Sequence, residues 1–288
     1  MLLEFTKMEG CGNDYVYIDG MKMDVPQDKK PSLVQKLSDR HFGIGGDGVI
    51  FINKGNAAEY EMEMYNADGT RAEMCGNGIR CVGKFLYDRG YTDKRKIFTV
   101  ESAGQIKTLT MTVDNEKAVA VRVDMGEPVL KAVDVPVVCE NEQAVDEGIE
   151  VDGNTYKMTC VSMGNPHAVL FWDGNIKADD FKIEEIGPKF ENHKRFPNRT
   201  NTEFVNVIDR TFAQMRVWER GTGETLACGT GTCATLVAAV LNGLMDDKAD
   251  IELLGGTLTI EWDRANTNHV FMTGPATEVF TGAVEVDL

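Results

Sequence analysis

The hydrophobic and polar positions along the chain mostly predict short strands. Residues 106–113 alternate in part between polar and apolar side chains, the period-two pattern of a strand with one buried face. Other short apolar segments recur along the sequence. We therefore expect strands at 15–18, 49–52, 97–100, 106–113, 168–171, 204–208, 257–260 and 270–273.

Helices are fewer than strands. Residues 30–40 are predicted to be helical because Leu33, Val34 and Leu37 fall on one face at helical spacing. Two more helices are expected, one after Cys75 and one after Cys228. Since strands and helices do not alternate in a regular βαβα order, the pattern favours mixed sheets over a doubly wound fold.

An internal repeat divides the chain into two similar halves. A Cys-Gly-polar-Gly unit begins at Cys75 and again at Cys228, each time before a predicted helix. A Gly-Asn dipeptide followed by a predicted strand precedes both units, with Asn13 placed 62 residues before Cys75 and Asn165 placed 63 before Cys228. Two independent matches at nearly the same offset indicate a duplication, with a boundary at the Gly/Pro break near 126–128.

Composition and charge exclude several functional classes. The 288 residues suffice for one large domain or two ordinary ones, with 30 Lys and Arg against 46 Asp and Glu, a net charge of −16. This acidity argues against nucleic acid or an anionic membrane as a partner, because both need clustered basic residues. No apolar run approaches the roughly eighteen residues of a membrane span, and residues 1–7 do not resemble a secretory leader.

The seven cysteines contain no C-x-x-C pair, so they make a poor disulfide framework and a poor zinc site. A cytoplasmic location is therefore expected. The four histidines show no metal-ligand spacing either, and we predict no metal. The Gly-rich segment 43–48 fits G-x-G-x-x-G, but a strand follows it where a dinucleotide fingerprint needs a helix.

Each Cys-Gly-x-Gly unit suits acid/base chemistry at a helix N-terminus. Glycines there allow backbone N–H groups to approach a carboxylate closely, and the helix dipole favours negative charge. The same field is expected to lower the pKa of the Cys75 and Cys228 thiols. The alternative is that each cysteine is a small buried residue in a turn. Two thiols from two halves would face each other across a cleft, one removing a proton from carbon and one delivering a proton to the opposite face.

These motifs resemble those of the diaminopimelate epimerase family. The resemblance rests on residues 66–81, 219–225 and 227–231, with two further matches at 10–14 and 164–167. It implies an α/β (α+β) fold of two pseudo-symmetric halves, each a mixed barrel-like sheet around a central helix, with the active site in the cleft between them. It also implies that the last strand returns to the first half. We therefore expect domains at 1–126 plus 276–288 and at 127–275.

The resemblance further implies the interconversion of LL- and meso-2,6-diaminopimelate in lysine biosynthesis, without pyridoxal phosphate or any other cofactor. Cys75 and Cys228 match the two catalytic acid/base groups, whose roles exchange with reaction direction. His167 and Glu219 match residues that modulate the thiol pKa values. The positions that match substrate-binding residues of the family are Asn13, Asn66, Gly76, Asn77, Asn165, Asn201, Glu219, Arg220, Gly229 and Thr230.

The residue types fit such a substrate. Diaminopimelate carries two ammonium and two carboxylate groups. Asn side chains can both donate hydrogen bonds to the carboxylates and accept them from the ammonium groups. Arg220 suits the distal carboxylate, and Glu219 suits an ammonium group. One departure is Gly48, where some members carry a substrate-contacting Gln. The partner is thus expected to be diaminopimelate, with neither nucleic acid nor membrane, and a homodimer is compatible with the sequence.

Two other functions remain open. One is a related racemase of another amino acid, of the proline, hydroxyproline or histidine type. The other is a non-enzymatic redox or binding protein in which Cys75 and Cys228 form a thiol switch. The remaining cysteines have no assigned role and are expected to be small buried side chains: Cys11, Cys81, Cys139, Cys160 and Cys233.

Overall fold

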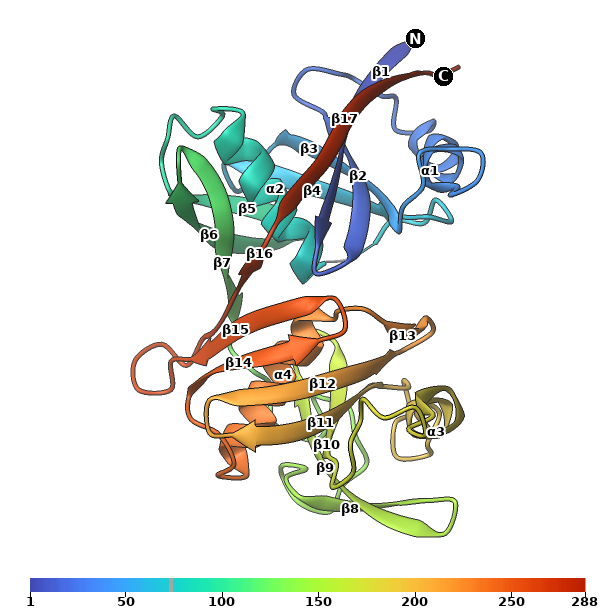
Figure 1. The fold of residues 1–288 in the computed structure, drawn as a ribbon, viewed down its shortest axis with the longest axis vertical. Helices are drawn as coiled ribbons and strands as arrows, with labels where there is room; N and C mark the ends of the chain where they lie inside the picture. Colours follow the sequence, from blue (N-terminus) through green and yellow to red (C-terminus); the bar gives the residue numbers. More distant parts are fainter. Residues whose placement is uncertain (73–74, 288) are drawn as a thin grey trace. The chain divides into compact units, whose positions relative to one another are not determined.

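A computed structural model describes residues 1–72 and 75–287, so Glu73 and Met74, within the Cys75 motif, and Leu288 lie outside the described residues. The chain divides into two compact units, residues 1–123 with 274–288 and residues 124–273. Each unit consists of a mixed sheet and a helix that the sheet largely encloses (Figure 1).

The sheet of the first unit has the strand order β17-β1-β2-β3-β4-β5-β6-β7. Successive neighbours pair antiparallel, antiparallel, parallel, antiparallel, parallel, antiparallel and antiparallel. The two chain ends meet on β1 and β17, where the Met1 ammonium donates to the Val286 carbonyl (Figure 1). The strands are β1 (Leu2–Gly10), β2 (Asn13–Asp19), β3 (Gly48–Lys54), β4 (Tyr60–Asn66), β5 (Ile97–Ser102), β6 (Gln105–Asp114), β7 (Lys117–Gly126) and β17 (Thr277–Glu285).

The sheet of the second unit has the order β8-β9-β10-β11-β12-β14-β15-β16, and the short β13 also pairs with β12. Its pairings follow the same succession as those of the first unit. This identity confirms the duplication that the repeated motifs predict. The strands are β8 (Glu147–Val151), β9 (Asn154–Ser162), β10 (Pro166–Phe171), β11 (Asn201–Asp209), β12 (Phe212–Glu219), β13 (Gly223–Thr225), β14 (Lys248–Leu253), β15 (Gly256–Trp262) and β16 (Val270–Pro275).

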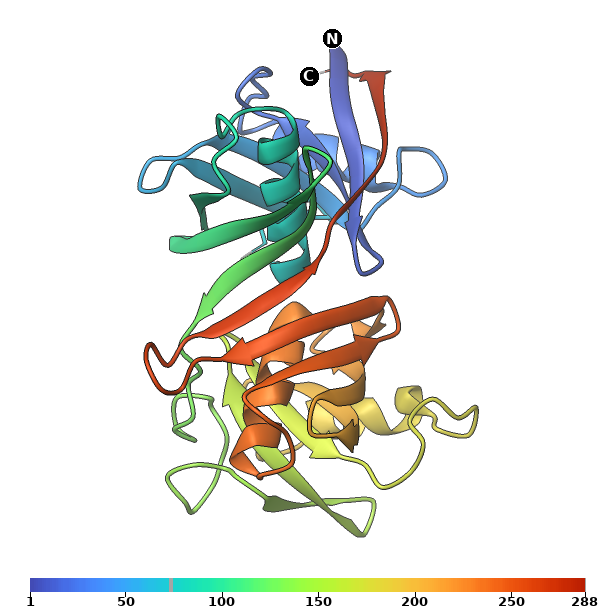
Figure 2. The same cartoon turned by 60° about the vertical axis from the view of Figure 1, so that its left-hand side comes forward.

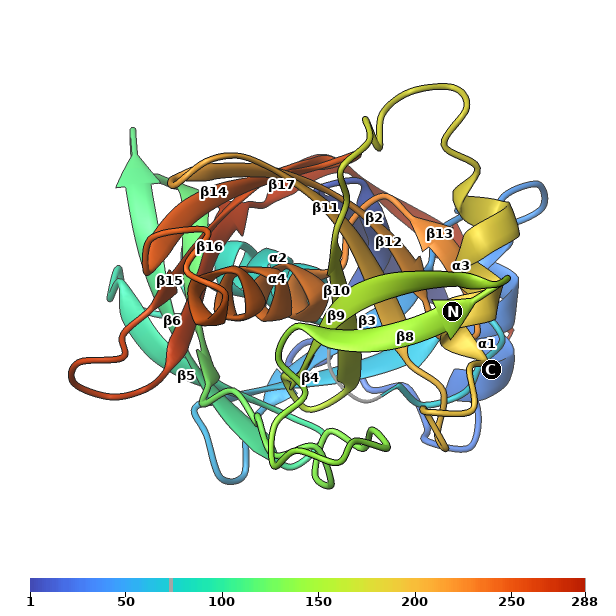
Figure 3. The same cartoon turned by 90° about the horizontal axis from the view of Figure 1, so that it is seen from below.

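The two enclosed helices are α2 (Gly76–Asp88) and α4 (Gly229–Leu241). In its own unit, α2 contacts β1, β2 and β6 (Figure 2), and α4 contacts β9, β10, β11, β14 and β15 (Figure 3). Nearly every residue of α4 is small or apolar and buried, as a helix covered on all sides requires. The helices predicted after Cys75 and after Cys228 are confirmed, as is each predicted strand segment.

Two further helices lie outside the sheets. Helix α1 (Lys30–Ser38) ends two residues before the predicted Arg40, because Asp39 turns to an extended conformation and its carboxylate accepts from the N–H groups of His41 and Phe42. Helix α3 (Ile183–Glu191) was not predicted; it contains Pro188, which breaks the helical pattern in the sequence.

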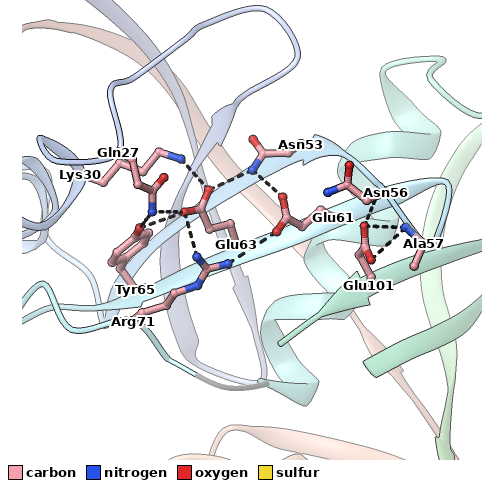
Figure 4. A network of polar contacts seen from close by, with 10 residues as sticks. All are labelled: Gln27, Lys30, Asn53, Asn56, Ala57, Glu61, Glu63, Tyr65, Arg71 and Glu101. Atoms are coloured by element: carbon pink, nitrogen blue, oxygen red, sulfur yellow. Dashed lines mark hydrogen bonds and ion pairs between the residues drawn. The ribbon is translucent and has the colours of Figure 1, made fainter. Parts of the chain in front are cut away.

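A buried ion pair fixes α1 against β4 (Figure 4). The Lys30 ammonium lies 2.5 Å from a carboxylate oxygen of Glu63, whose side chain is only 4% exposed, and Gln27 and Tyr65 also donate to it. Burial alone would raise the pKa of Glu63, but these hydrogen bonds and the Lys30 charge lower it to about 2. The pair thus stabilises the region in which β4 ends at the predicted substrate residue Asn66.

Candidate active site

Cys75 occupies the N-cap position of α2, in an extended conformation with φ −118° and ψ 113°. Its Sγ accepts a hydrogen bond from the Gly78 N–H at 3.3 Å. A Cβ on Gly78 would approach Cys75 Sγ to 3.6 Å and Ile50 Cδ1 to 2.8 Å. The Cys-Gly-x-Gly motif therefore places a thiol on the positive end of the helix dipole, with glycine where the helix meets the sheet.

Asn13 connects Cys75 to a chain of charged side chains. The Cys75 thiol donates to Asn13 Oδ1 at 3.1 Å, and Asn13 Nδ2 donates to Asp47 at 2.6 Å. Asp47 in turn pairs with Arg40 at 2.9 Å, and Arg40 also pairs with Asp14 at 2.7 Å. Because an ionised carboxylate only accepts, Asp47 fixes the Asn13 amide with its oxygen toward sulfur, an arrangement that favours protonated Cys75.

Arg80 lies behind the first turn of α2 and is completely buried. It donates to Asn77 Oδ1 at 2.9 Å, to the Gly76 carbonyl at 3.2 Å and to the Pro275 carbonyl at 3.1 Å. A buried guanidinium at the N-terminus of α2 adds positive charge next to the backbone of Gly76 and Asn77. It also fixes the conformation of this turn.

Asn66 and Gly48 face each other across β3 and β4. Asn66 is exposed and donates to Thr70 Oγ1 at 3.1 Å in its own turn. A Cβ on Gly48 would lie 2.0 Å from the Tyr65 carbonyl oxygen. The backbone thus leaves no room for a side chain at position 48, and the Gln contact of some family members is absent from this position.

Cys228 repeats the geometry of Cys75 in the second unit. It is the N-cap residue of α4, with φ −121° and ψ 108°, and its Sγ accepts from the Gly231 N–H at 3.4 Å. The Thr230 hydroxyl lies 3.5 Å from the same sulfur. The hydrogen bonds from Thr230 and from the Gly231 N–H at the helix N-terminus lower the pKa of this thiol, as expected, but the predicted net decrease is wrong. Burial and, after it, the carboxylates of Glu219 and Glu203 raise the pKa of Cys228 well above its ordinary value.

Glu219 ends strand β12, and its carboxylate accepts from the Thr225 hydroxyl at 2.5 Å. Burial raises the pKa of Glu219 above its ordinary value, while the Thr225 hydrogen bond and the nearby His167 act in the opposite direction. A carboxyl group with a raised pKa exchanges protons more readily near neutral pH. Glu219 and Cys228 thus lie close enough for their charges to influence each other.

His167 lies in β10 between two polar side chains, and both it and Glu203 are completely buried. Its Nδ1 lies 2.7 Å from Glu203 Oε1, and its Nε2 lies 3.0 Å from Asn165 Oδ1. The parallel pairing of β10 with β11 positions these residues, since it aligns His167 with Asn201 and Val169 with Glu203.

Asn201 and Arg220 are joined through the backbone. Asn201 is buried, donates to the Pro166 carbonyl at 2.8 Å and accepts from the Arg220 N–H at 2.9 Å. The Arg220 guanidinium donates to the Asn198 carbonyl at 3.1 Å and is half-buried. Asn201 thereby fixes the start of the turn that presents Arg220.

The predicted residues therefore form two clusters, each within one unit. In the first unit, Asn13 accepts from the Cys75 thiol, whereas the side chain of Asn66 donates to Thr70 in its own turn. In the second unit, Thr230 and Glu219 lie next to Cys228, and His167 contacts Asn165. Sequence reasoning missed four residues that contact predicted site residues directly, Asp47, Arg80, Glu203 and Thr225, and also Arg40, which pairs with Asp47. Asp47 lies in the Gly-rich segment 43–48, which is predicted to be a tight loop near the active site but without a role for Asp47, and Arg80 lies inside the Cys75 motif itself.

All seven cysteines are free thiols. Within residues 1–72 and 75–287, no group of three or more His, Cys, Asp or Glu side chains is arranged to hold a metal ion. The helices of this same part of the chain include none that is both long and apolar enough to cross a membrane.

Comparison with known proteins gives consistent matches. The model of the family described as diaminopimelate epimerase matches residues 5–131 and 159–279. The chain is 52% identical over 285 residues to a diaminopimelate epimerase of Methanococcus maripaludis, covering 99% of this chain and 100% of that one. It is 54% identical over 286 residues to that of Acetivibrio thermocellus, covering 99% of both chains. It is also 46% identical to the chloroplastic enzyme of Oryza sativa, covering 98% of this chain and 80% of the plant protein.

Solved structures with little sequence similarity share the fold. A hydroxyproline epimerase from Agrobacterium vitis superposes with a TM-score of 0.67 at 13% identity, covering 98% of this chain and 91% of that one. A PhzF-family phenazine biosynthesis protein from Bacillus anthracis superposes with a TM-score of 0.69 at 16% identity, covering 99% and 100%. At such low identity the similarity concerns the fold alone.

Proposed function

This chain belongs to the diaminopimelate epimerase family, and we propose that Cys75 and Cys228 are the acid and base with which it interconverts LL- and meso-2,6-diaminopimelate in lysine biosynthesis. The enzyme is an isomerase whose substrate is a small molecule. The observation that carries the two-thiol mechanism is the repeated N-cap: in equivalent positions of two equivalent sheets, a cysteine sulfur accepts from the N–H three residues later.

The reaction inverts one α-carbon by moving a single proton on each face. One thiolate removes the α-proton, and the electron pair of the broken C–H bond moves toward the adjacent carboxylate. The other thiol then delivers its proton to the opposite face of the same carbon and becomes a thiolate. Atoms and charge balance without a cofactor, and the two cysteines exchange roles when the reaction runs backward.

The helix N-termini are suited to the reacting carboxylate. First-turn N–H groups of a helix point outward at its positive end, and they include those of Gly76 and Asn77 in α2 and of Gly229 and Thr230 in α4. As the α-proton leaves, negative charge builds up on that carboxylate. N–H groups already aimed at it stabilise the charge without reorganising.

The other end of the substrate needs both donors and acceptors. Arg220 offers a guanidinium for a carboxylate, and Glu219 offers a carboxylate for an ammonium. The amides of Asn13, Asn66 and Asn165, with the buried Asn201 behind Arg220, complete the set that we assign to substrate recognition. We assign the first half of the site to residues 1–126 plus 276–288 and the second half to residues 127–275.

The mechanism requires two reduced thiols, and for this reason we expect the protein in the cytoplasm. It requires neither nucleic acid nor a membrane. A homodimer stays a prediction that the reaction itself does not need.

The test follows exchange of the α-proton with solvent deuterium by proton NMR. The substrates are LL- and meso-diaminopimelate, proline, hydroxyproline and histidine. We expect exchange and epimerisation of diaminopimelate only, and loss of epimerisation in both Cys75→Ala and Cys228→Ala.

Cys81→Ala and Cys233→Ala are the matched controls, since each removes a buried thiol from the same two helices. Burial raises the pKa of Cys81 to about 12, so this thiol stays protonated, and its removal should leave exchange intact. Exchange of proline instead of diaminopimelate would favour the related racemase, and no exchange with any substrate would favour a thiol switch. Near-normal epimerisation by either active-site variant would refute the two-thiol mechanism.

A further inference from the structure

The second unit buries a carboxylate that the mechanism above does not use. Glu203, in β11, is completely buried, and its Oε1 lies 2.7 Å from His167 Nδ1. Its other oxygen, Oε2, is also buried and has no hydrogen-bond partner among the described residues. Burying a carboxylate is expensive unless a positive charge balances it, and of the contacts given above His167 is the one that can supply that charge.

A doubly protonated ring satisfies both contacts of His167. Glu203 Oε1 accepts when ionised, and therefore Nδ1 carries a hydrogen. Nε2 faces Asn165 Oδ1 at 3.0 Å, which is also an acceptor, and therefore Nε2 carries a hydrogen too. With both nitrogens donating, the ring would be an imidazolium, and the Glu203–His167 pair would be neutral as a whole.

Glu203 also packs against the first turn of α4. A Cβ on Gly231 would lie 2.5 Å from Glu203 Oε1 and 3.3 Å from Cys228 Sγ. The same Gly231 supplies the N–H that Cys228 accepts. Gly231 therefore lies between the Glu203 carboxylate and the Cys228 thiol, where a larger residue would not fit.

The first unit shows which side chain occupies the position equivalent to Glu203 when no charge is needed. Tyr15 and His167 occupy equivalent places in the repeated Gly-Asn segments. In the parallel pairings that follow, Tyr17 aligns with Ile50 and Val169 aligns with Glu203, so Ile50 is the equivalent of Glu203. Gly78 of α2 packs on Ile50 as Gly231 of α4 packs on Glu203. The sheet and helix thus pack equally well on an apolar side chain, and the charge of Glu203 is not a requirement of the fold.

We propose that Glu203 is a positioning residue of the Cys228 cluster: its carboxylate holds His167 doubly protonated, and His167 thereby fixes the Asn165 amide with its Nδ2 hydrogens directed to the substrate. This inference rests on the proposed function. If Nε2 lost its hydrogen, the amide would turn to donate to it, and an oxygen would replace the donor at the substrate. Glu203 is thus separated from the substrate by two side chains, His167 and Asn165, and it acts on substrate binding through them.

The other titratable groups near this pair come from three elements. Glu219 lies at the end of β12, Cys228 caps α4, and Cys160 lies in β9. The Glu203 charge helps to raise the pKa of all three, after the larger effect of burial. A change at Glu203 is therefore expected to alter the pH profile as well as substrate binding.

The test uses Glu203→Gln, which keeps the shape and removes the charge. The protein is labelled with ¹⁵N-histidine, and the His167 signals are assigned with His167→Gln. At pH about 7.5 we expect two protonated ring nitrogens in the wild type and one in Glu203→Gln. The KM for diaminopimelate should rise about tenfold or more, with a smaller change in kcat and a shifted pH profile of kcat/KM.

Two further variants separate positioning from folding. Glu63→Gln removes another buried carboxylate, in the first unit, and should lower stability without changing the His167 spectrum or the KM. The double variant His167→Tyr with Glu203→Ile rebuilds the pair of the first unit; it should fold and retain the raised KM.

A single protonated nitrogen on His167 in the wild type would overturn the proposal. So would an unchanged KM and pH profile in a folded Glu203→Gln, or a double variant that does not fold. If the wild type failed to exchange the α-proton of diaminopimelate, the proposed function would fail, whereas the ¹⁵N spectra would still decide the protonation of His167.

Discussion

The buried pair of Lys30 and Glu63 gives a prediction whose size follows from the structure (Figure 4). Glu63→Gln removes the negative charge and leaves the Lys30 ammonium, with a side chain 10% exposed, without its ionic partner. The pKa of Glu63 is lowered from 4.5 to about 2. At about 1.4 kcal/mol for each pKa unit, the ionised carboxylate contributes roughly 3 kcal/mol to the free energy of unfolding at neutral pH.

This contribution depends on pH in a defined direction. Because the folded-state pKa lies below the unfolded one, the stabilisation is complete above about pH 5 and is lost as the pH falls toward 2. Urea unfolding followed by circular dichroism measures it, at pH 7 and at pH 3. The difference between wild type and Glu63→Gln should be roughly 3 kcal/mol at pH 7 and less than half of that at pH 3.

The control is Glu61→Gln, in the same strand. The Glu61 side chain is 25% exposed, and its ion pair with Arg71 spans 3.6 Å, so its loss should cost less than about 1 kcal/mol. Equal urea midpoints for the two variants, or a wild-type advantage over Glu63→Gln that does not change between pH 7 and pH 3, would refute the reasoning.

Three other predictions concern the active site. Arg80→Met should raise the KM at least tenfold and lower the melting temperature, because the buried guanidinium fixes the first turn of α2; wild-type kinetics would contradict this role. Gly48→Ala should lower the melting temperature strongly, since its Cβ would lie 2.0 Å from a carbonyl oxygen; differential scanning calorimetry measures the loss. Mild oxidation should inactivate the enzyme by linking Cys75 to Cys228; mass spectrometry that finds both thiols free in inactive protein would exclude the link.

Much of the fold could be predicted because the duplication is visible in the sequence. Short motifs at Cys75 and Cys228 predict two equivalent units, and the pairings of the strands confirm them. Helix α3 could not be predicted, because Pro188 interrupts its pattern and its stability comes from packing in its own unit, including contacts with β12 and β13. The exposed β17 was expected only from the family resemblance, and its pairing with β1 is a long-range contact that no local pattern encodes.

The candidate site was predictable where its residues follow one another along the chain. Glu203 was missed because the apolar pattern predicts a strand from 204, whereas β11 begins at Asn201 and includes Glu203. The role proposed for Glu203 depends on the register of β11 with β10, which brings its carboxylate to His167. Asp47 was missed for the same reason, since only the fold brings it to Asn13. Pairs that are distant in sequence and specific in register are outside the reach of a single sequence.

The wrong expectation for the Cys228 pKa bears on how the thiols work. Helix N-termini were expected to stabilise the thiolate, yet Asn13 Oδ1 accepts from the Cys75 thiol, and burial with two carboxylates raises the pKa of Cys228. An α-proton is very weakly acidic, and the thiolate of a weakly acidic thiol is the stronger base toward it, although a smaller fraction is ionised. In the proposed mechanism, the positive helix N-termini then stabilise the substrate carboxylate, on which negative charge develops during the reaction. In the same mechanism, the helix N-termini would lower the barrier by stabilising the substrate carboxylate, and the nearby carboxylates would make the thiolate of Cys228 a stronger base.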